Sequence, residues 1–324
     1  MSNLDTNPEE TVCRTAVHDQ PDDHAVAQLL EPRDVPLGGL RGIHVARLLP
    51  QRGLPTVGAW CFLDVFGPNN SQMSVLPHPH TGLQTVTWPI AGEIHHRDSV
   101  GSDVLVRPGQ LNLMTGGHGV AHSEISTNGG ELLHGLQLWV ALPAERAGMA
   151  PAFEQHVDLP VYAHGGVTAT VLIGTLGEAT SPATVHTPLL GADLRVAEGS
   201  RTTVPLRPDF EHAVLAVGGP LVVSGVEVPS GRLLYLGTGR SELMLSAGRD
   251  VRAVLLGGEP FPDELVMWWN FVGRSHEEIA AARADWEAAG HPRFGVVHGH
   301  GGARIPAPEM PVVRLTPRRH GHRR

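Results

Sequence analysis

Two histidines stand two residues apart in the segment LPHPHTGLQTVTW, residues 76–88. Successive side chains of an extended strand point to opposite faces, so His78 and His80 share a face and can lean onto one ion. Pro79 between them cannot donate a ladder hydrogen bond, which places the pair at a strand end or a sheet edge. Gln84 is four residues after His80 and would share the same face of a continuous strand, so we expect it in the pocket beside the pair. Imidazole is a common metal ligand, and the pair therefore indicates a metal site.

A second pair follows in LNLMTGGHGVAHSEIS, residues 111–126. Its glycines predict a tight turn, because glycine adopts positive φ angles at little cost. The chain then re-enters a strand in which His122 and Glu124 share one face. If the strands of the two segments lie side by side, three imidazoles and one carboxylate meet at one point. That ligand set suits a first-row divalent metal.

The remaining histidines of the 20 in the chain give weaker signals. His95 and His96 are adjacent and point to opposite faces of a strand, so at most one of them is expected near the site. No specific site is expected for the histidines of the Gly- and Arg-rich C-terminal region, namely His298, His300, His320 and His322.

The elements that must position these side chains are predicted to be strands. Aromatic residues make up 5% of the chain, while 39 glycines and 27 prolines separate many short apolar or alternating runs. Such runs, bounded by turn residues, are typical of all-β sandwiches and barrels.

One helix is predicted, in RSHEEIAAARADWEAAGHP. Ser275 with Glu278 forms a capping box, and Gly290 and Pro292 end the segment. The apolar residues at helical spacing are expected to pack on a barrel wall; they are Ile279, Ala282 and Trp286.

The chain is expected to divide into four parts. Residues 1–34 hold eight acidic residues and two arginines, a composition typical of a mobile leader. Two barrels follow, at 35–165 and 166–300, with the boundary near the irregular segment EQHVDLPVYAHGGV. Residues 301–324 are expected to form a basic, disordered tail.

Composition excludes several functional classes. A net charge of −9 argues against direct nucleic-acid binding. No apolar run approaches the roughly 20 residues that cross a bilayer, so no membrane association is expected. Cys13 and Cys61 are the only cysteines and offer no disulfide framework, which agrees with a cytoplasmic protein.

At this point the sequence resembles the pirins, members of the cupin superfamily. The matching stretches are VGAWCFLDVFGP, HPHTGLQTVTWPIAGEIHHRDSVGS, RPGQLNLMTGGHGVAHSE, GLQLWVALP and GGEPFPDELVMWWNFVGRSHEEI, in that order over residues 40–290. The resemblance implies two antiparallel, jelly-roll-like cupin barrels packed face to face, with a short C-terminal helix. It also implies one metal ion in the first barrel, held by His78, His80, His122 and Glu124, and a second barrel without metal.

The chain departs from the family pattern at three positions. Gln84 stands where many cupins carry Glu, which leaves Glu124 as the one anionic ligand. In the turn that commonly reads TAGRGI and here reads TGGHGV, a glycine replaces Ala and His118 replaces Arg. We expect His118 to alter the charge at the pocket mouth.

The resemblance implies a mononuclear non-haem dioxygenase acting on a small aromatic or enol substrate with O2, in the manner of quercetin 2,3-dioxygenase. Fe(II) is the expected ion, with Mn, Ni, Co, Cu or Zn as alternatives. On a six-coordinate ion, four protein ligands leave two positions open for O2 or a substrate. Glu124 is the expected base for the substrate hydroxyl.

Two other functions remain open at this stage. The first is a redox-sensitive regulatory module that binds a protein partner. The second is a structural site, since four protein ligands would close the shell of tetrahedral zinc.

Overall fold

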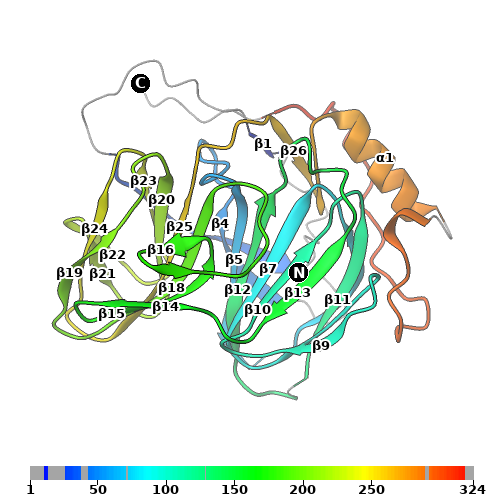
Figure 1. Ribbon diagram of the computed structural model, residues 1–324. Coiled ribbons are helices and arrows are strands. Elements are labelled where there is room, and N and C mark those ends of the chain that lie inside the picture. Colours follow the sequence, from blue (N-terminus) through cyan, green and yellow to red (C-terminus); the bar gives the residue numbers. More distant parts are fainter. Residues whose placement is uncertain are drawn as a thin grey trace.

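The structure is a computed structural model that describes residues 11–13, 26–37, 43–70, 72–127, 129–288 and 292–317. Two antiparallel barrels lie side by side, with the single α-helix of the described residues on the outer side of the first barrel (Figure 1). The all-β fold predicted from the sequence, including its C-terminal helix, is confirmed. None of the helices in these ranges has the length and apolar character needed to cross a bilayer.

The first barrel is built from a seven-stranded and a four-stranded sheet. In spatial order the larger sheet contains β13 (Ala152–His156), β10 (Leu111–Thr115), β7 (Leu83–Ala91), β12 (Leu133–Ala141), β5 (Trp60–Asn69), β4 (Ile43–Leu49) and β3 (Arg33–Leu37). The smaller sheet contains β6 (Ser74–His80), β11 (Val120–Ser126), β8 (Ile94–Asp98) and β9 (Asp103–Val106).

The second barrel repeats this arrangement. Its larger sheet contains β14 (Val161–His164), β15 (Val167–Ile173), β18 (Leu189–Val196), β25 (Val251–Gly258), β20 (Glu211–Ala216), β23 (Leu233–Gly237) and β2 (Gln28–Leu30). Its smaller sheet contains β19 (Arg201–Pro205), β24 (Glu242–Ser246), β21 (Leu221–Val223) and β22 (Val226–Val228). A short hairpin is formed by β16 (Thr175–Leu176) and β17 (Ala179–Thr180).

The chain returns to the first barrel after completing the second. A three-stranded sheet joins β1 (Thr11–Cys13), β26 (Leu265–Trp268) and β27 (Phe271–Gly273), and α1 (His276–Glu287) and a 3-10 turn (Pro292–Phe294) follow. Residues from β26, β27, α1 and the 3-10 turn pack in one apolar cluster with Phe66 and Val75 of the first barrel. From the sequence, residues 265–300 are expected to belong to the second barrel. In the structure they pack against the first barrel.

The helix begins and packs as its sequence predicts. Ser275 is the N-cap, and its hydroxyl accepts the N–H of Glu278 at 3.2 Å. The residues predicted to pack are buried, namely Ile279, Ala282 and Trp286. The indole N–H of Trp286 donates to the carbonyl of Ile305 at 2.8 Å, which ties the helix to the segment that follows it.

Both terminal segments contain ordered residues where mobility is expected from composition. Residues 28–30 pair with β23 and residues 33–37 pair with β4, although they fall in or at the end of the acidic leader. In the expected tail, Ile305, Ala307 and Leu315 are buried. The composition does not predict this, because a few apolar side chains find a partner surface only in the folded barrel. Residues 318–324 lie outside the described residues.

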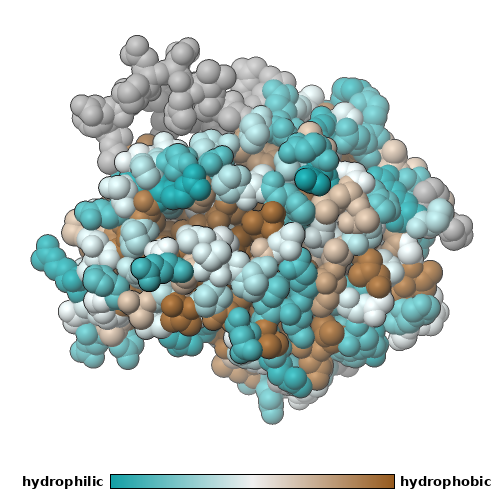
Figure 2. Space-filling model, in the orientation of Figure 1, coloured by the Kyte–Doolittle hydropathy of each residue, from teal (hydrophilic) through white to brown (hydrophobic). Residues whose placement is uncertain are grey.

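Apolar side chains form three clusters. One lies between the barrels and includes Trp88 of β7 and Leu256 of β25. The second is the cluster around Phe66 and Val75, and the third fills the second barrel. On the face shown in Figure 2, most of the surface is hydrophilic.

Candidate metal centre

The histidines predicted from spacing meet on the inner face of the four-stranded sheet. Strands β6 and β11 are antiparallel neighbours, and His78 lies directly opposite His122 in their register. Ligand atoms of His78, His80 and His122 all lie within 4.8 Å of one another, and all three residues are fully buried. The pairing of the two segments, which the sequence could only suppose, is thus observed.

The hydrogen bond of His78 leaves one of its ring nitrogens free, and the other two rings bring one nitrogen each close together. His78 Nδ1 lies 2.9 Å from the carbonyl oxygen of Leu76 and must donate to it, so His78 Nε2 carries no hydrogen. This buried Nε2 has no hydrogen-bond partner among the described residues. The Nε2 atoms of His80 and His122 are 3.1 Å apart. Two ligands at right angles on an ion with bonds of about 2.1 Å would be about 3.0 Å apart, so the spacing fits a metal ion.

The histidines are in the protonation state that binds metals. Burial lowers the pKa of His78, His80 and His122 well below the usual value, because desolvation penalises the charged imidazolium. Repulsion from the neighbouring rings lowers the pKa of His78 and His122 further. Neutral imidazole is the form that coordinates a metal.

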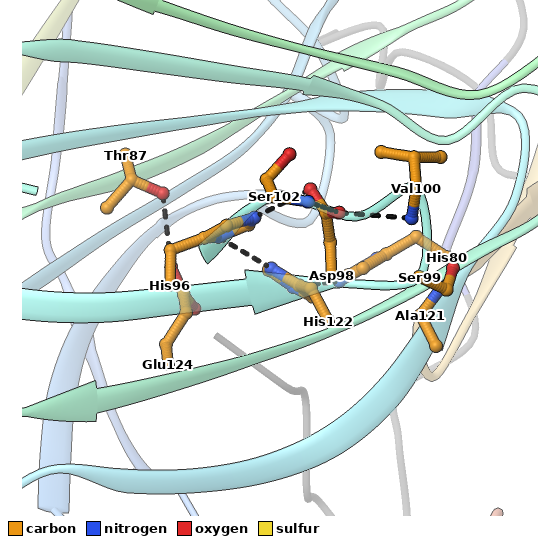
Figure 3. Close-up of polar contacts among 10 residues, drawn as sticks. All are labelled: His80, Thr87, His96, Asp98, Ser99, Val100, Ser102, Ala121, His122 and Glu124. Atoms are coloured by element: carbon orange, nitrogen blue, oxygen red, sulfur yellow. Dashed lines mark hydrogen bonds and ion pairs between the residues drawn. The ribbon is translucent and has the colours of Figure 1, made fainter. Parts of the chain in front are cut away.

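Glu124 belongs to a second group of potential ligands, which shares His122 with the first. It is buried on β11, and its ligand atom lies within 4.8 Å of those of His96 and His122. Its Oε1 lies 3.1 Å from the hydroxyl of Thr87 (Figure 3), which shares its single hydrogen between this oxygen and Gln137 Oε1 at 2.9 Å. Thr87 belongs to β7, on the seven-stranded sheet, so the carboxylate reaches across the barrel interior.

His96 is the group that sequence reasoning did not assign to the site. It lies on β8, next to β11, and its Nδ1 is 3.4 Å from Nδ1 of His122. His95 points the other way and pairs with Asp103, as expected for adjacent strand residues. The overlooked signal was His96 and Asp98, which share the two-residue spacing of the other pairs.

Gln84 does not join this cluster. Its Nε2 donates to Thr115 Oγ1 at 2.9 Å and to the carbonyl of Thr184 at 3.0 Å, so the amide links the first barrel to the second half of the chain. The alternation of side chains that relates His78 to His80 does not continue to Gln84, because the chain turns at Gly82 (φ +69°) and enters the other sheet. The expectation that Gln84 lines the pocket beside the histidines is therefore wrong.

His118 lies exposed on the glycine turn before β11. Its Nδ1 is 3.1 Å from the carbonyl oxygen of Met149, and its own carbonyl accepts from Arg293 at 2.8 Å. These contacts hold the turn to the segments around it. An effect of His118 on the pocket mouth stays a prediction.

The wall opposite the histidines carries unpaired polar groups. Asn112, Thr87 and Gln137 lie side by side across β10, β7 and β12, and all are buried. Both amide atoms of Asn112, Nε2 of Gln137 and Nε1 of Trp139 have no hydrogen-bond partner among the described residues. Trp139 presents its ring to His80 in an edge contact with centroids 5.2 Å apart. Because an unpaired buried polar group costs about 1–3 kcal/mol, this wall is suited to an oxygen- or nitrogen-bearing ligand.

Comparisons with known proteins agree with this architecture. A family model described as Pirin matches residues 42–140, and one described as Pirin C-terminal cupin domain matches residues 191–294. A Pseudomonas aeruginosa protein, provisionally named a quercetin 2,3-dioxygenase, is 45% identical over 311 residues, covering 94% of this chain and 98% of its own. A pirin-like protein of Caulobacter vibrioides is 35% identical, covering 83% of this chain and 96% of its own.

A solved structure is also similar. The crystal structure described as quercetin 2,3-dioxygenase from Acinetobacter baumannii is 40% identical, with a TM-score of 0.84, and the match covers 90% of this chain and 98% of that one.

Proposed function

The chain belongs to the pirin family, and from this premise we propose that it is a metal-dependent dioxygenase acting on a small aromatic or enol substrate, with flavonols as the first candidates. One observation carries the proposal: three neutral, buried imidazoles form one group of potential ligands inside the first barrel, and the carboxylate of Glu124 forms a second group with His96 and the shared His122. The names of the Pseudomonas and Acinetobacter proteins support the choice of flavonols.

The protein would hold one divalent ion through the group of His78, His80 and His122, with Glu124, which lies within reach of His122, as the fourth ligand. We propose Fe(II), with Mn, Ni, Co, Cu or Zn as alternatives. When bound there, such an ion would supply the Lewis-acid and redox chemistry that the reaction of the substrate with O2 requires.

The remaining steps fall to the chain's own residues. Glu124 accepts the proton of the substrate hydroxyl, and the Thr87 hydroxyl fixes the carboxylate for that transfer. Asn112 and Gln137 hydrogen-bond to the oxygen atoms of the substrate from the opposite wall. Burial of the whole set excludes bulk water.

The experiment is reconstitution of the metal-free protein with Fe(II), Mn, Ni, Co, Cu or Zn in separate samples. Each sample is mixed with quercetin under oxygen, and flavonol absorbance and O2 consumption are followed together. Loss of both at equal rates, in at least one sample and not in the His80→Ala variant, is the expected result. No turnover with any of these ions would contradict flavonol dioxygenase activity.

A further inference from the structure

A line of three side chains leads away from the candidate ion on the side of β8. Asp98 Oδ2 is 3.0 Å from His96 Nε2, and His96 Nδ1 is 3.4 Å from His122 Nδ1 (Figure 3). All three residues are buried. His122 then presents its Nε2 to the Nε2 of His80.

The carboxylate at the end of this line sets the position of every hydrogen along it. Asp98 Oδ1 accepts the backbone N–H groups of Val100 and Ser102 at 3.0 and 2.8 Å, so the turn between β8 and β9 fixes the side chain. These two backbone N–H donors stabilise the ionised carboxylate over the protonated acid. An ionised carboxylate only accepts hydrogen bonds, so His96 Nε2 must be the donor.

The tautomers of both rings follow. A neutral His96 with its hydrogen on Nε2 has a lone pair on Nδ1. Since this lone pair faces His122 Nδ1, that nitrogen must carry the hydrogen of His122. His122 Nε2 is then left with a lone pair, which is the form a metal requires.

We propose that His96 is a positioning residue that, with Asp98, locks His122 in the tautomer and orientation needed to bind the ion. The proposal rests on His122 being a ligand, as the proposed function requires. It extends the site beyond its four ligands to a third strand. Such outer contacts fix the orientation of metal-binding histidines and affect metal affinity about 10–100-fold.

His96 itself is held rigidly enough for this role. Its ring stacks on Phe153 with centroids 4.6 Å apart and 22° between the planes. Phe153 belongs to β13, on the opposite sheet, so the ring is fixed from the barrel interior as well as by Asp98.

The test is the Asp98→Asn variant, whose side chain has the same size. The amide oxygen introduced by this substitution can still accept from the turn, but the amide N–H₂ faces His96 Nε2 and forces that nitrogen to become an acceptor. His96 Nδ1 then carries a hydrogen toward His122, whose own hydrogen is displaced to Nε2. We expect Co(II) affinity, measured by chelator competition, to fall about 10–100-fold and the visible Co(II) spectrum to change.

Two further variants separate positioning from folding. Asp103→Asn alters the equivalent carboxylate–histidine pair on the exposed side of the same hairpin, with His95, and is expected to bind Co(II) like the wild type. His96→Phe keeps the stack on Phe153 but removes the hydrogen bonds, so it should lose affinity as Asp98→Asn does. His96→Gln, which can accept and donate at once, should recover part of that loss.

Wild-type affinity and an unchanged spectrum in Asp98→Asn would overturn the proposal. So would a wild-type protein that binds no Co(II), or pulsed EPR of the Cu(II) form showing one coordinated imidazole fewer in His96→Phe, because His96 would then be a ligand. Binding is measured without substrate, so a failure of flavonol turnover would leave this result standing.

Discussion

In the first barrel the four-stranded sheet turns histidines and a glutamate inward, whereas the matching sheet of the second barrel turns valine and leucine inward. His78 pairs with His122 across β6 and β11. At the corresponding place, Val204 pairs with Leu243 across β19 and β24, and Leu245 is the next inward residue. The two sheets have the same strand order in their barrels, so backbone architecture alone does not create a metal site.

The difference shows how a barrel can tolerate a polar interior. The second barrel is stabilised by its own apolar core. The first barrel is supported from outside: Trp88 packs in the cluster between the barrels and donates to Asp193 at 3.2 Å. On its other side, Ser123 and Pro77 bond to His300 and Ile305 of the C-terminal segment, at 2.9 and 2.8 Å. The strands that carry the ligands are thus held by contacts that do not use the interior.

The largest effect is expected from removing a ligand in the first barrel. His122→Ala should weaken Co(II) binding by more than about 100-fold, because losing a ligand costs more than losing its outer contact. Equilibrium binding of Co(II) by chelator competition measures this. Affinity within about tenfold of the wild type would show that His122 is not a ligand.

The corresponding experiment in the second barrel is the substitution Leu243→Ala. Leu243 is fully buried, so its truncation should lower the free energy of unfolding by about 2–5 kcal/mol. Metal affinity should be unchanged. Urea denaturation and Co(II) titration of the same sample check both statements. A loss of Co(II) affinity without a loss of stability would contradict the assignment of metal binding to the first barrel and of apolar stabilisation to the second.

A third prediction concerns His212, the buried histidine of the second barrel. Burial lowers the pKa of His212 to about 4, and neither ring nitrogen has a hydrogen-bond partner among the described residues. As pH falls below about 6.5 the unfolded chain takes up a proton that the folded chain refuses. Stability should therefore fall between about pH 6.5 and 4, by at most about 3 kcal/mol from this residue.

The His212→Leu variant removes that contribution. Its unfolding free energy, measured in urea at about pH 7 and about pH 4.5, should fall less on acidification than that of the wild type. Equal losses in the two proteins would mean that His212 is protonated as easily in the folded state as in the unfolded one.

The smallest effect on stability is expected at Asn112 in the first barrel. Asn112→Leu replaces an unpaired buried amide with an apolar group, so the free energy of unfolding should stay the same or rise by about 1 kcal/mol. The KM for quercetin should rise about tenfold, because a substrate hydrogen bond is lost. An unchanged KM would remove Asn112 from the substrate-binding wall.

Local patterns in the sequence were sufficient for much of this description. Two-residue spacing placed His78 with His80 and His122 with Glu124 because strand side chains alternate. The capping box at Ser275 predicted the helix because its hydrogen bonds are made within a few residues. The same alternation predicted that the adjacent His95 and His96 point to opposite faces of their strand.

Only the tertiary structure decided which strands meet and which faces they turn inward. It moved Gln84 away from the histidines, brought His96 in from a third strand, and folded residues 301–317 onto the first barrel. The physical reason is that alternation fixes the two faces of one strand relative to each other, while the choice of inner face depends on turns, sheet order and apolar partners distant in the chain.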